Sequence, residues 1–115
     1  MDVRRSSQRQ EKRITRSLKQ IKEDARTTPG SGNQYYCKSD VVSEHFRVEA
    51  KTKVKDSKSI TIKREWLDKI AVEAFETNKT PALAFSFGDG TDYMVLRDRD
   101  FYTMVEKLHG GEADG

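Results

Sequence analysis

The segment 46–54, FRVEAKTKV, alternates between apolar and polar side chains along its whole length. A period of two residues is typical of a β-strand that buries one face and exposes the other. The apolar positions begin with Phe46, Val48 and Ala50, so Glu49 and Lys51 fall together on the opposite face. The pattern predicts a strand here, and it raises the question of why a carboxylate and an ammonium share one face, with Asp40 a short way upstream.

The rest of the chain supplies helices and further strands around this segment. Apolar side chains at i, i+4 and i+7 predict a helix from about Ser7 to Asp24, and the breakers of TTPGSGNQ end it. A broad apolar face predicts a second helix, and alternating or apolar runs predict strands. In chain order after the first helix, we expect strands at 35–43 and 45–54, a short β-branched run at 60–62, a helix at 63–78, strands at 81–87 and 92–97, and a last helix that ends near 109.

This succession predicts an α/β domain with a mixed central β-sheet flanked by helices, in the order α-β-β-β-α-β-β-α. A length of 115 residues is sufficient for one domain with a modest core. We expect a flexible basic arm at 1–8, a single domain at 9–109 and a disordered tail at 110–115.

Composition narrows the class of protein. Hydrophobic residues make up 34% of the chain and charged residues 36%, so the core is small and the surface is rich in ions. Cys37 is the only cysteine, which excludes an internal disulfide and is typical of a reducing compartment. No apolar run approaches membrane-spanning length, and the first residues lack the apolar segment of a signal peptide. We therefore expect a soluble cytoplasmic protein with no membrane partner.

Charge is divided unevenly along the chain. Residues 1–64 hold 17 Lys or Arg against 8 Asp or Glu, a net of +9, whereas residues 65–115 hold 5 against 11, a net of −6. A basic half favours a polyanionic partner, and nucleic acid binds clustered cations through its phosphates. The alternative is a basic arm that binds nothing in particular.

The acidic groups near the alternating strand are suited to metal chemistry. Asp40 and Glu49 come together if their two strands are adjacent and antiparallel, and the Ala50 carbonyl adds a third oxygen. Mg²⁺ prefers hard oxygen ligands of this kind. Lys51 on the same face as Glu49 is placed to neutralise charge that develops on a phosphate. The alternatives are a solvated strand face and an aspartate that serves a turn.

Four features together resemble a known family. They are Glu11 on the first helix, the loop PGSGN, the segment KSDV that contains Asp40, and E-A-K at 49–51. In this order they resemble the PD-(D/E)xK nuclease superfamily, and within it the archaeal-type Holliday-junction resolvases and their phage relatives. The resemblance covers about residues 9–87, and the order of elements agrees through the last helix.

The resemblance implies a restriction-endonuclease-like fold and a site for Mg²⁺, with Mn²⁺ as a substitute. It implies that Asp40 and Glu49 are the principal metal ligands with the Ala50 carbonyl, that Glu11 is a further one, and that Lys51 is the catalytic lysine. Ser31 matches the serine of the resolvase loop, which holds the scissile phosphate. In the resolvases, the arginine that contacts a phosphate usually follows the glutamate directly, whereas in this sequence Lys12 stands at that position and Arg13 comes next. The resemblance therefore leaves this role open between Lys12 and Arg13.

The implied activity is resolution of four-way junctions by a homodimer, in the cytoplasm or in a host cytoplasm if the chain is phage-encoded. Other nucleases of the superfamily acting on linear or branched DNA, and a non-catalytic DNA-binding protein, are the alternatives. Further basic residues are candidates for gripping DNA, although they are equally typical of an ordinary surface. With the loop serine, the DNA-binding candidates are Lys12, Arg13, Ser31, Lys38, Lys53, Lys55, Lys58, Lys63 and Arg64.

Overall fold

The computed structural model describes residues 3–28 and 39–110. Three helices and five strands follow one another in the predicted order, and the predicted α/β class with a mixed sheet and flanking helices is confirmed. The elements are α1 Val3–Gln20, β1 Ala25–Thr27, β2 Val41–Ser43, β3 Phe46–Thr52, α2 Arg64–Glu76, β4 Thr80–Ser86, β5 Tyr93–Val95 and α3 Asp98–Leu108.

The five strands form one sheet in the order β1-β2-β3-β4-β5. β3 and β4 are parallel, with Val48 opposite Ala82, whereas the other three neighbouring pairs are antiparallel. A parallel pair requires a long crossover, and α2 provides it. β4 is apolar at nearly every position because it is central and covered on both faces.

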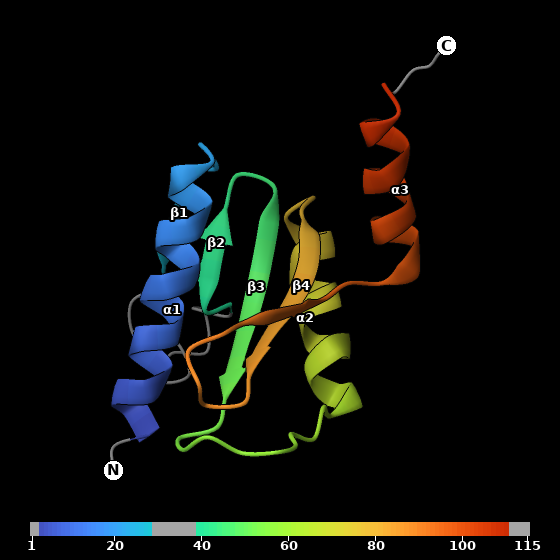
Figure 1. Ribbon diagram of the computed structural model, residues 1–115. Helices are drawn as coiled ribbons and strands as arrows, with labels where there is room; N and C mark the ends of the chain where they lie inside the picture. The colour runs from blue at the N-terminus through green and yellow to red at the C-terminus, as the bar shows by residue number, and fades with distance from the viewer. Residues whose placement is uncertain (1–2, 29–38, 111–115) are drawn as a thin grey trace.

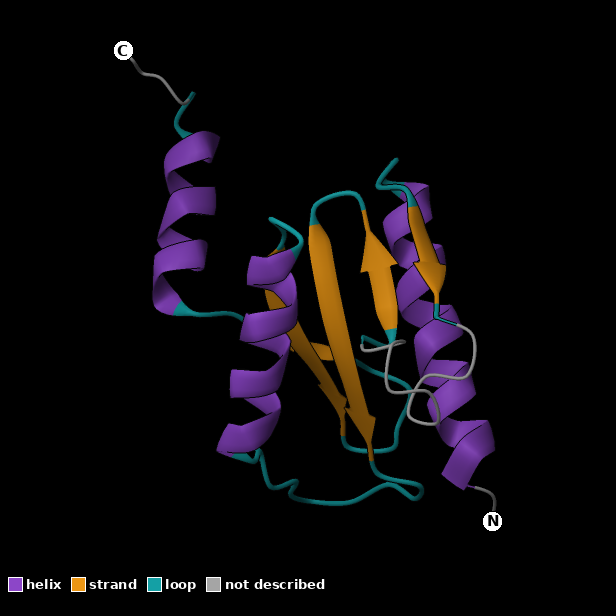
Figure 2. Cartoon of the chain, turned by 180° about the vertical axis from the view of Figure 1, so that it is seen from behind, coloured by secondary structure: helices purple, strands orange, loops and turns teal. Residues whose placement is uncertain are grey.

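Helices α1 and α2 cover opposite faces of the sheet, with α1 in front in Figure 1 and α2 in front in the reverse view of Figure 2. On the α1 side, Ile14 packs with Val48 and Ala82 in the main hydrophobic cluster. On the α2 side, Ile70 and Leu83 are almost fully buried. Alternation along β3 and β4 therefore separates the two layers of the core.

The first helix differs from its predicted bounds. α1 begins at Val3 and ends at Gln20, so residues 3–8, expected as a flexible arm, are helical. Ser6 is buried although it is polar, so hydrophobic periodicity did not detect this part of the helix. Gln10, within the predicted helix, is likewise polar and buried. Ile21, within the helix range predicted from the sequence, lies beyond the helix end and is 74% exposed.

The third strand was predicted in the wrong place. Residues 60–62 form no strand, and β3 pairs with β2 and β4 instead. β1 supplies the strand instead and pairs with β2, with Ala25 opposite Ser43. Three residues with one buried apolar side chain are too short to give a periodic signal. β2 begins at Val41, and the expected strand residues 35–38 lie outside the described part of the chain.

Helix α3 projects away from the sheet at one end of the molecule (Figures 1 and 2). None of its residues is buried, and Phe101 and Leu108 are 52% and 83% exposed. Within the described residues, no helix is both long enough and apolar enough to cross a bilayer.

Candidate metal and nucleic-acid site

Asp40 and Glu49 lie on neighbouring antiparallel segments. Asp40 immediately precedes β2, and its N–H donates to the carbonyl of Val48 at 3.0 Å. Its Oδ2 accepts a hydrogen bond from the N–H of Ala50 at 2.8 Å. The short β2–β3 connection thus brings the Asp40 carboxylate to the backbone beside Glu49, which is the arrangement that the sequence analysis required.

The Glu49 carboxylate is nearly buried, with 10% of its side chain exposed. Burial raises its pKa, and the charge of Asp40 raises it further, while Lys69 and Lys51 oppose both effects. Oε1 lies 3.4 Å from the Nζ of Lys69, and Oε2 lies 3.5 Å from the Nζ of Lys51. The carboxylate therefore sits between two ammonium groups.

Glu11 reaches the same region from α1. Burial raises its pKa from 4.5 to about 7, with further contributions from the charges of Asp40 and Glu49. Three acidic groups from one helix and two strand segments therefore act on one another electrostatically. Carboxylate oxygens of this kind are the donors that Mg²⁺ accepts, and a divalent cation would offset their mutual repulsion. Their ligand atoms do not all lie within 4.8 Å of one another in this structure, so the three carboxylates would have to move closer together to share one ion.

Lys51 contacts an aromatic ring of α2. Its Nζ lies 4.5 Å from the centroid of Trp66, which belongs to the first turn of α2. The Nζ of Lys63 lies 5.8 Å from the same ring. Cation–π contact and the ion pair with Glu49 together fix the lysine at the margin of the acidic group. Trp66 thus contacts the candidate catalytic lysine.

Further ionic contacts surround Glu49 that the sequence does not reveal. Lys69 on α2 lies 3.4 Å from Oε2 of Glu73 as well as beside Glu49. Glu73 is buried and accepts a hydrogen bond from the hydroxyl of Ser39 at 2.7 Å, and Ser39 accepts another from Arg47. The i, i+4 spacing of Lys69 and Glu73 was the available signal, but such pairs are common on exposed helix faces.

Arg13 is engaged inside the molecule. Its Nε and NH2 donate to the two carboxylate oxygens of Asp92, both at 2.8 Å. The neighbouring Gln10 is 1% exposed and donates to the carbonyl of Lys51 at 2.9 Å and to Asp92 at 3.2 Å, whereas its Oε1 has no partner among the described residues. These bonds attach α1 to β3 and to the segment before β5. Lys12 is exposed, so it is the freer of the two residues proposed for a phosphate.

The remaining DNA-binding candidates fall into two surfaces. Exposed residues of the loop after β3 and of the start of α2 form one, and they are Lys53, Lys55, Lys58, Lys63 and Arg64. A shallow groove between α1 and β1 forms the other, with a volume of about 580 Å³, and it is lined by four cations, Lys12, Arg16, Lys19 and Arg26. The groove cannot be recognised as a unit from the sequence, because Arg26 joins it only through the position of β1. Ser31 and Lys38 lie outside the described residues.

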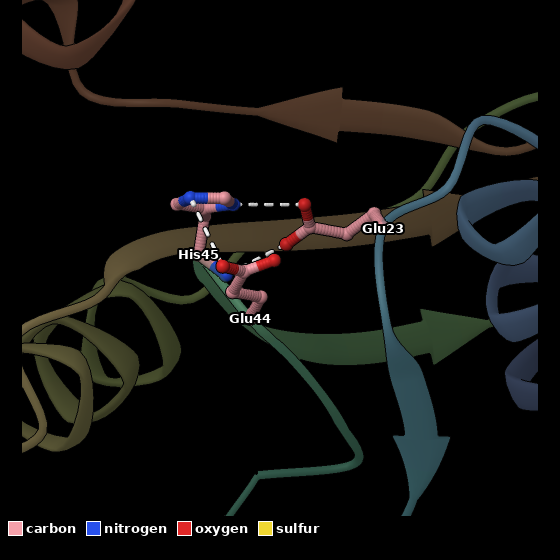
Figure 3. A group of neighbouring side chains, drawn as sticks. All are labelled: Glu23, Glu44 and His45. Carbon is pink, nitrogen blue, oxygen red and sulfur yellow. Dashed lines mark hydrogen bonds and ion pairs between the residues drawn. The ribbon is translucent and has the colours of Figure 1, made fainter.

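A separate group lies at the β2–β3 turn. Glu23, Glu44 and His45 are the three residues in the described chain whose ligand-type atoms all lie within 4.8 Å of one another (Figure 3), a spacing that Glu11, Asp40 and Glu49 do not share. Glu23 already accepts hydrogen bonds from the N–H of His45 at 2.6 Å and from its Nδ1 at 2.9 Å. The hydrogen bond and the charge of Glu23 raise the pKa of His45. These contacts join the β2–β3 turn to the segment that follows α1. The sequence showed no partner for His45 because Glu23 is distant along the chain.

Comparison with solved structures finds the same fold in a nuclease. The described similarity is to Hjc of Archaeoglobus fulgidus, a Holliday junction resolvase from an archaeal hyperthermophile, with a TM-score of 0.61 and 13% sequence identity. The match covers 75% of this chain and 72% of that one. No protein-family model matches the sequence, and no curated protein sequence is similar to it. At this identity the likeness shows the fold, which is the one that the residue pattern predicts.

Proposed function

We propose that this protein is a metal-dependent, structure-selective DNA endonuclease that resolves four-way junctions. The observation that carries the proposal is the convergence of the charges of Asp40 and Glu49 on Glu11, whose pKa is about 7, beside Lys51. A cluster of partly buried carboxylates that repel one another is typical of a cation site. The likeness of the fold to that of the Archaeoglobus resolvase, with a TM-score of 0.61, adds support.

Each residue has a distinct role in this proposal. Asp40, Glu49 and Glu11 hold the cation with the Ala50 carbonyl, and the N–H of Ala50 orients Asp40 through its 2.8 Å hydrogen bond. When bound, Mg²⁺ or Mn²⁺ supplies Lewis-acid polarisation of the phosphodiester and lowers the pKa of a nearby water. Glu49 now forms ion pairs with Lys51 and Lys69, and it would have to exchange these contacts to act as a metal ligand.

Lys51 then faces the reacting phosphate. Water adds to phosphorus, the bond to the 3′ oxygen breaks, and the products carry a 5′-phosphate and a 3′-hydroxyl. The ammonium of Lys51 neutralises charge that grows on the phosphate oxygens, and Trp66 restricts where that ammonium can lie. Ser31 is proposed to hold the same phosphate from the loop before β2.

DNA affinity comes from the basic surfaces. The proposed phosphate contacts are Lys12 and the groove with Arg16, Lys19 and Arg26, together with Lys38, the loop lysines and the start of α2. Arg13 takes a positioning role through Asp92. Because a junction has two opposed strands to cut, we further propose a homodimer with one site per subunit.

Cleavage of a synthetic immobile junction tests the proposal. The purified protein is incubated with the junction and with a linear duplex of matched sequence, each with Mg²⁺ and with EDTA. The expected result is Mg²⁺-dependent paired nicks in opposed strands of the junction. Equal cutting of the linear duplex would show another nuclease of the same superfamily.

A non-catalytic DNA-binding protein is the second candidate. The observation in its favour is that the ammonium groups of Lys51 and Lys69 already form ion pairs with the Glu49 carboxylate, so its charge can be balanced by the protein itself. Junction binding without strand scission at any Mg²⁺ or Mn²⁺ concentration would establish it.

A further inference from the structure

A small polar cavity opens beside the candidate metal site, on the α1 side of the loops that follow β3 and β4. Its volume is about 90 Å³, and on that scale one water needs only about 10–15 Å³. It is lined by Ser6, Arg9 and Arg13 of α1, by residues 52–54 including Lys53, and by Ser86, Gly88 and Gly90. Three cations and no acidic residue thus line a cavity that is too polar to be a packing defect.

The walls of the cavity are held firmly. The N–H of Lys53 donates to the carbonyl of Ser86 at 3.1 Å, and the N–H of Gly88 donates to the hydroxyl of Ser86 at 3.1 Å. A Cβ on Gly88 would lie 2.4 Å from the carbonyl oxygen of Lys55, so this position requires glycine and locks the two loops together. In Figure 1 these loops meet the N-terminal half of α1 at the end of β3 and β4.

The free charge in the cavity is positive. Arg13 is neutralised by Asp92, and Asp89 is near enough to affect its pKa. Within the described residues, Arg9 and Lys53 form no ion pair, although Arg9 donates to the Ser6 hydroxyl at 3.5 Å. Two unpaired cations with hydroxyl groups beside them are the usual recognition elements for a phosphate.

Glycine leaves the mouth of the cavity open. Gly90 has a φ of +91°, and a Cβ placed there would meet nothing within 4 Å. Glycine permits both this backbone conformation and the close approach of a ligand to the main chain.

The cavity begins at Thr52, directly after Lys51, and Lys53 lies about 7 Å along the extended chain from that lysine.

We propose that this cavity, the Arg9–Lys53 pocket, binds a backbone phosphate of the DNA strand that is being cut, next to the scissile phosphate. The proposal rests on the proposed nuclease function and adds a contact that fixes the strand relative to Lys51. The pocket holds the neighbouring phosphate through the guanidinium of Arg9, the ammonium of Lys53 and the Ser6 hydroxyl. Arg13 forms its wall and keeps its bond to Asp92.

A charge-removal variant tests the pocket in the full-length protein. Arg9→Gln with Lys53→Gln is compared with Arg99→Gln with Lys107→Gln, which removes the same charge from exposed positions on α3, far from the pocket. Junction affinity is measured with Ca²⁺ in place of Mg²⁺ over a range of salt concentrations. We expect the pocket variant to bind roughly tenfold more weakly, with a salt slope that falls by about one per lost phosphate contact. The control variant should change affinity by less than about twofold.

Neutral phosphate analogues locate the contact. Junctions that carry one methylphosphonate at successive positions around the cut site are bound to wild type and to the pocket variant. One position next to the scissile phosphate should weaken wild-type binding roughly tenfold and leave the pocket variant unaffected. Equal sensitivity of the two proteins at every position would overturn the proposal.

Titration with inorganic phosphate separates this proposal from the nuclease function. The amide signals of Gly88 and Gly90 should shift in wild type and stay unchanged in the Arg9→Gln, Lys53→Gln variant. Shifts without any sensitive methylphosphonate position would show a site for free phosphate and overturn the DNA contact. If the protein neither binds nor cuts DNA, the proposed nuclease function is wrong. If, in addition, inorganic phosphate shifts neither the Gly88 nor the Gly90 amide signal, the proposed phosphate site in the Arg9–Lys53 pocket is wrong as well.

Discussion

At the scale of single residues, Glu49 is the side chain whose surroundings matter most. It is nearly buried, its pKa is raised by burial and by Asp40, and it contacts two lysines on different elements. A buried acid with both acidic and basic neighbours serves either a structural ion network or a metal site, and substitution separates these roles.

Glu49→Gln and Asp40→Asn should each lower junction cleavage by at least about 100-fold, because each removes a charged metal ligand from the reaction. Junction binding should stay within about twofold, since affinity comes from the basic surfaces. Single-turnover cleavage and binding in Ca²⁺ are the measurements. Glu65→Gln, an exposed acid in the first turn of α2, is the control and should cleave normally. Parallel loss of binding and cleavage would contradict these roles.

Glu11 gives the molecule a pH dependence. Its pKa is about 7 in the folded chain against 4.5 for an ordinary glutamate, so the folded state holds the proton more tightly. The free energy of unfolding should therefore fall as pH rises from about 4.5 to 7, by about 1 kcal/mol after solvent screening of this half-exposed group. Glu11→Gln should remove that fall, as measured by urea unfolding at several pH values.

The same proton competes with the cation. Ionised carboxylates bind the metal, so affinity for Mg²⁺ should rise roughly tenfold between pH 6 and pH 8. Carbon NMR of the Glu11 carboxyl should show a titration near pH 7 that moves lower when Mg²⁺ is added. A titration that Mg²⁺ leaves unchanged would place Glu11 outside the metal site.

At the scale of elements, α1 is positioned by polar contacts as much as by its apolar stripe. Arg13 and Gln10 join it to Asp92 and to the backbone of β3, and these bonds set where Glu11 stands. The helix therefore depends on a segment that lies far away in the sequence.

A double-mutant cycle on Arg13→Ala and Asp92→Ala should give a coupling free energy of about 1–2 kcal/mol, because the pair is bidentate and largely shielded from water. The exposed pair Arg64 and Asp68, 3.6 Å apart on α2, is the control and should give no more than about 0.5 kcal/mol. Urea unfolding of the single and double variants measures both. Equal coupling in the two pairs would mean that the Arg13 contact does not anchor α1.

At the scale of the whole molecule, α3 leaves an amphipathic surface uncovered. Phe101 and Leu108 are more than half exposed on a helix with no buried residue, and exposed apolar side chains of this kind are typical of an interface. A second copy of the chain is the occupant that the proposed cutting of two strands requires.

Phe101→Asp with Leu108→Asp should convert a dimer to a monomer, because each change places a charge in the proposed interface. The stability of the subunit should change little, since neither side chain is buried. Sedimentation analysis measures the mass, and junction cleavage should lose the pairing of its nicks. Phe75→Asp, which alters an equally exposed side chain on α2, is the control. A monomeric wild type at concentrations that cut junctions would contradict the dimer.

The fold was largely predictable because most of its elements bury a periodic face. β3, α2 and β4 each carry an apolar pattern that predicts their type, and the class follows from their order. The predictions were wrong where the buried side chains are polar or where the element is very short. Ser6 is buried without being apolar, β1 has three residues, and residues 60–62 have the composition of a strand but form none.

The candidate site divides in the same way. Glu49 and Lys51 share a face by local periodicity, so the sequence by itself determined their proximity. The expected pairing of two strands pointed to Asp40, and the resemblance to resolvases pointed to Glu11. Tertiary structure alone decided that Lys69 and Trp66 contact this pair, that Asp92 engages Arg13, and that Arg9 and Lys53 share a cavity. The reason is physical: a strand's period reports which side chains share its face, whereas partners that are far apart in sequence meet only once the packing of helices on the sheet has set their distances.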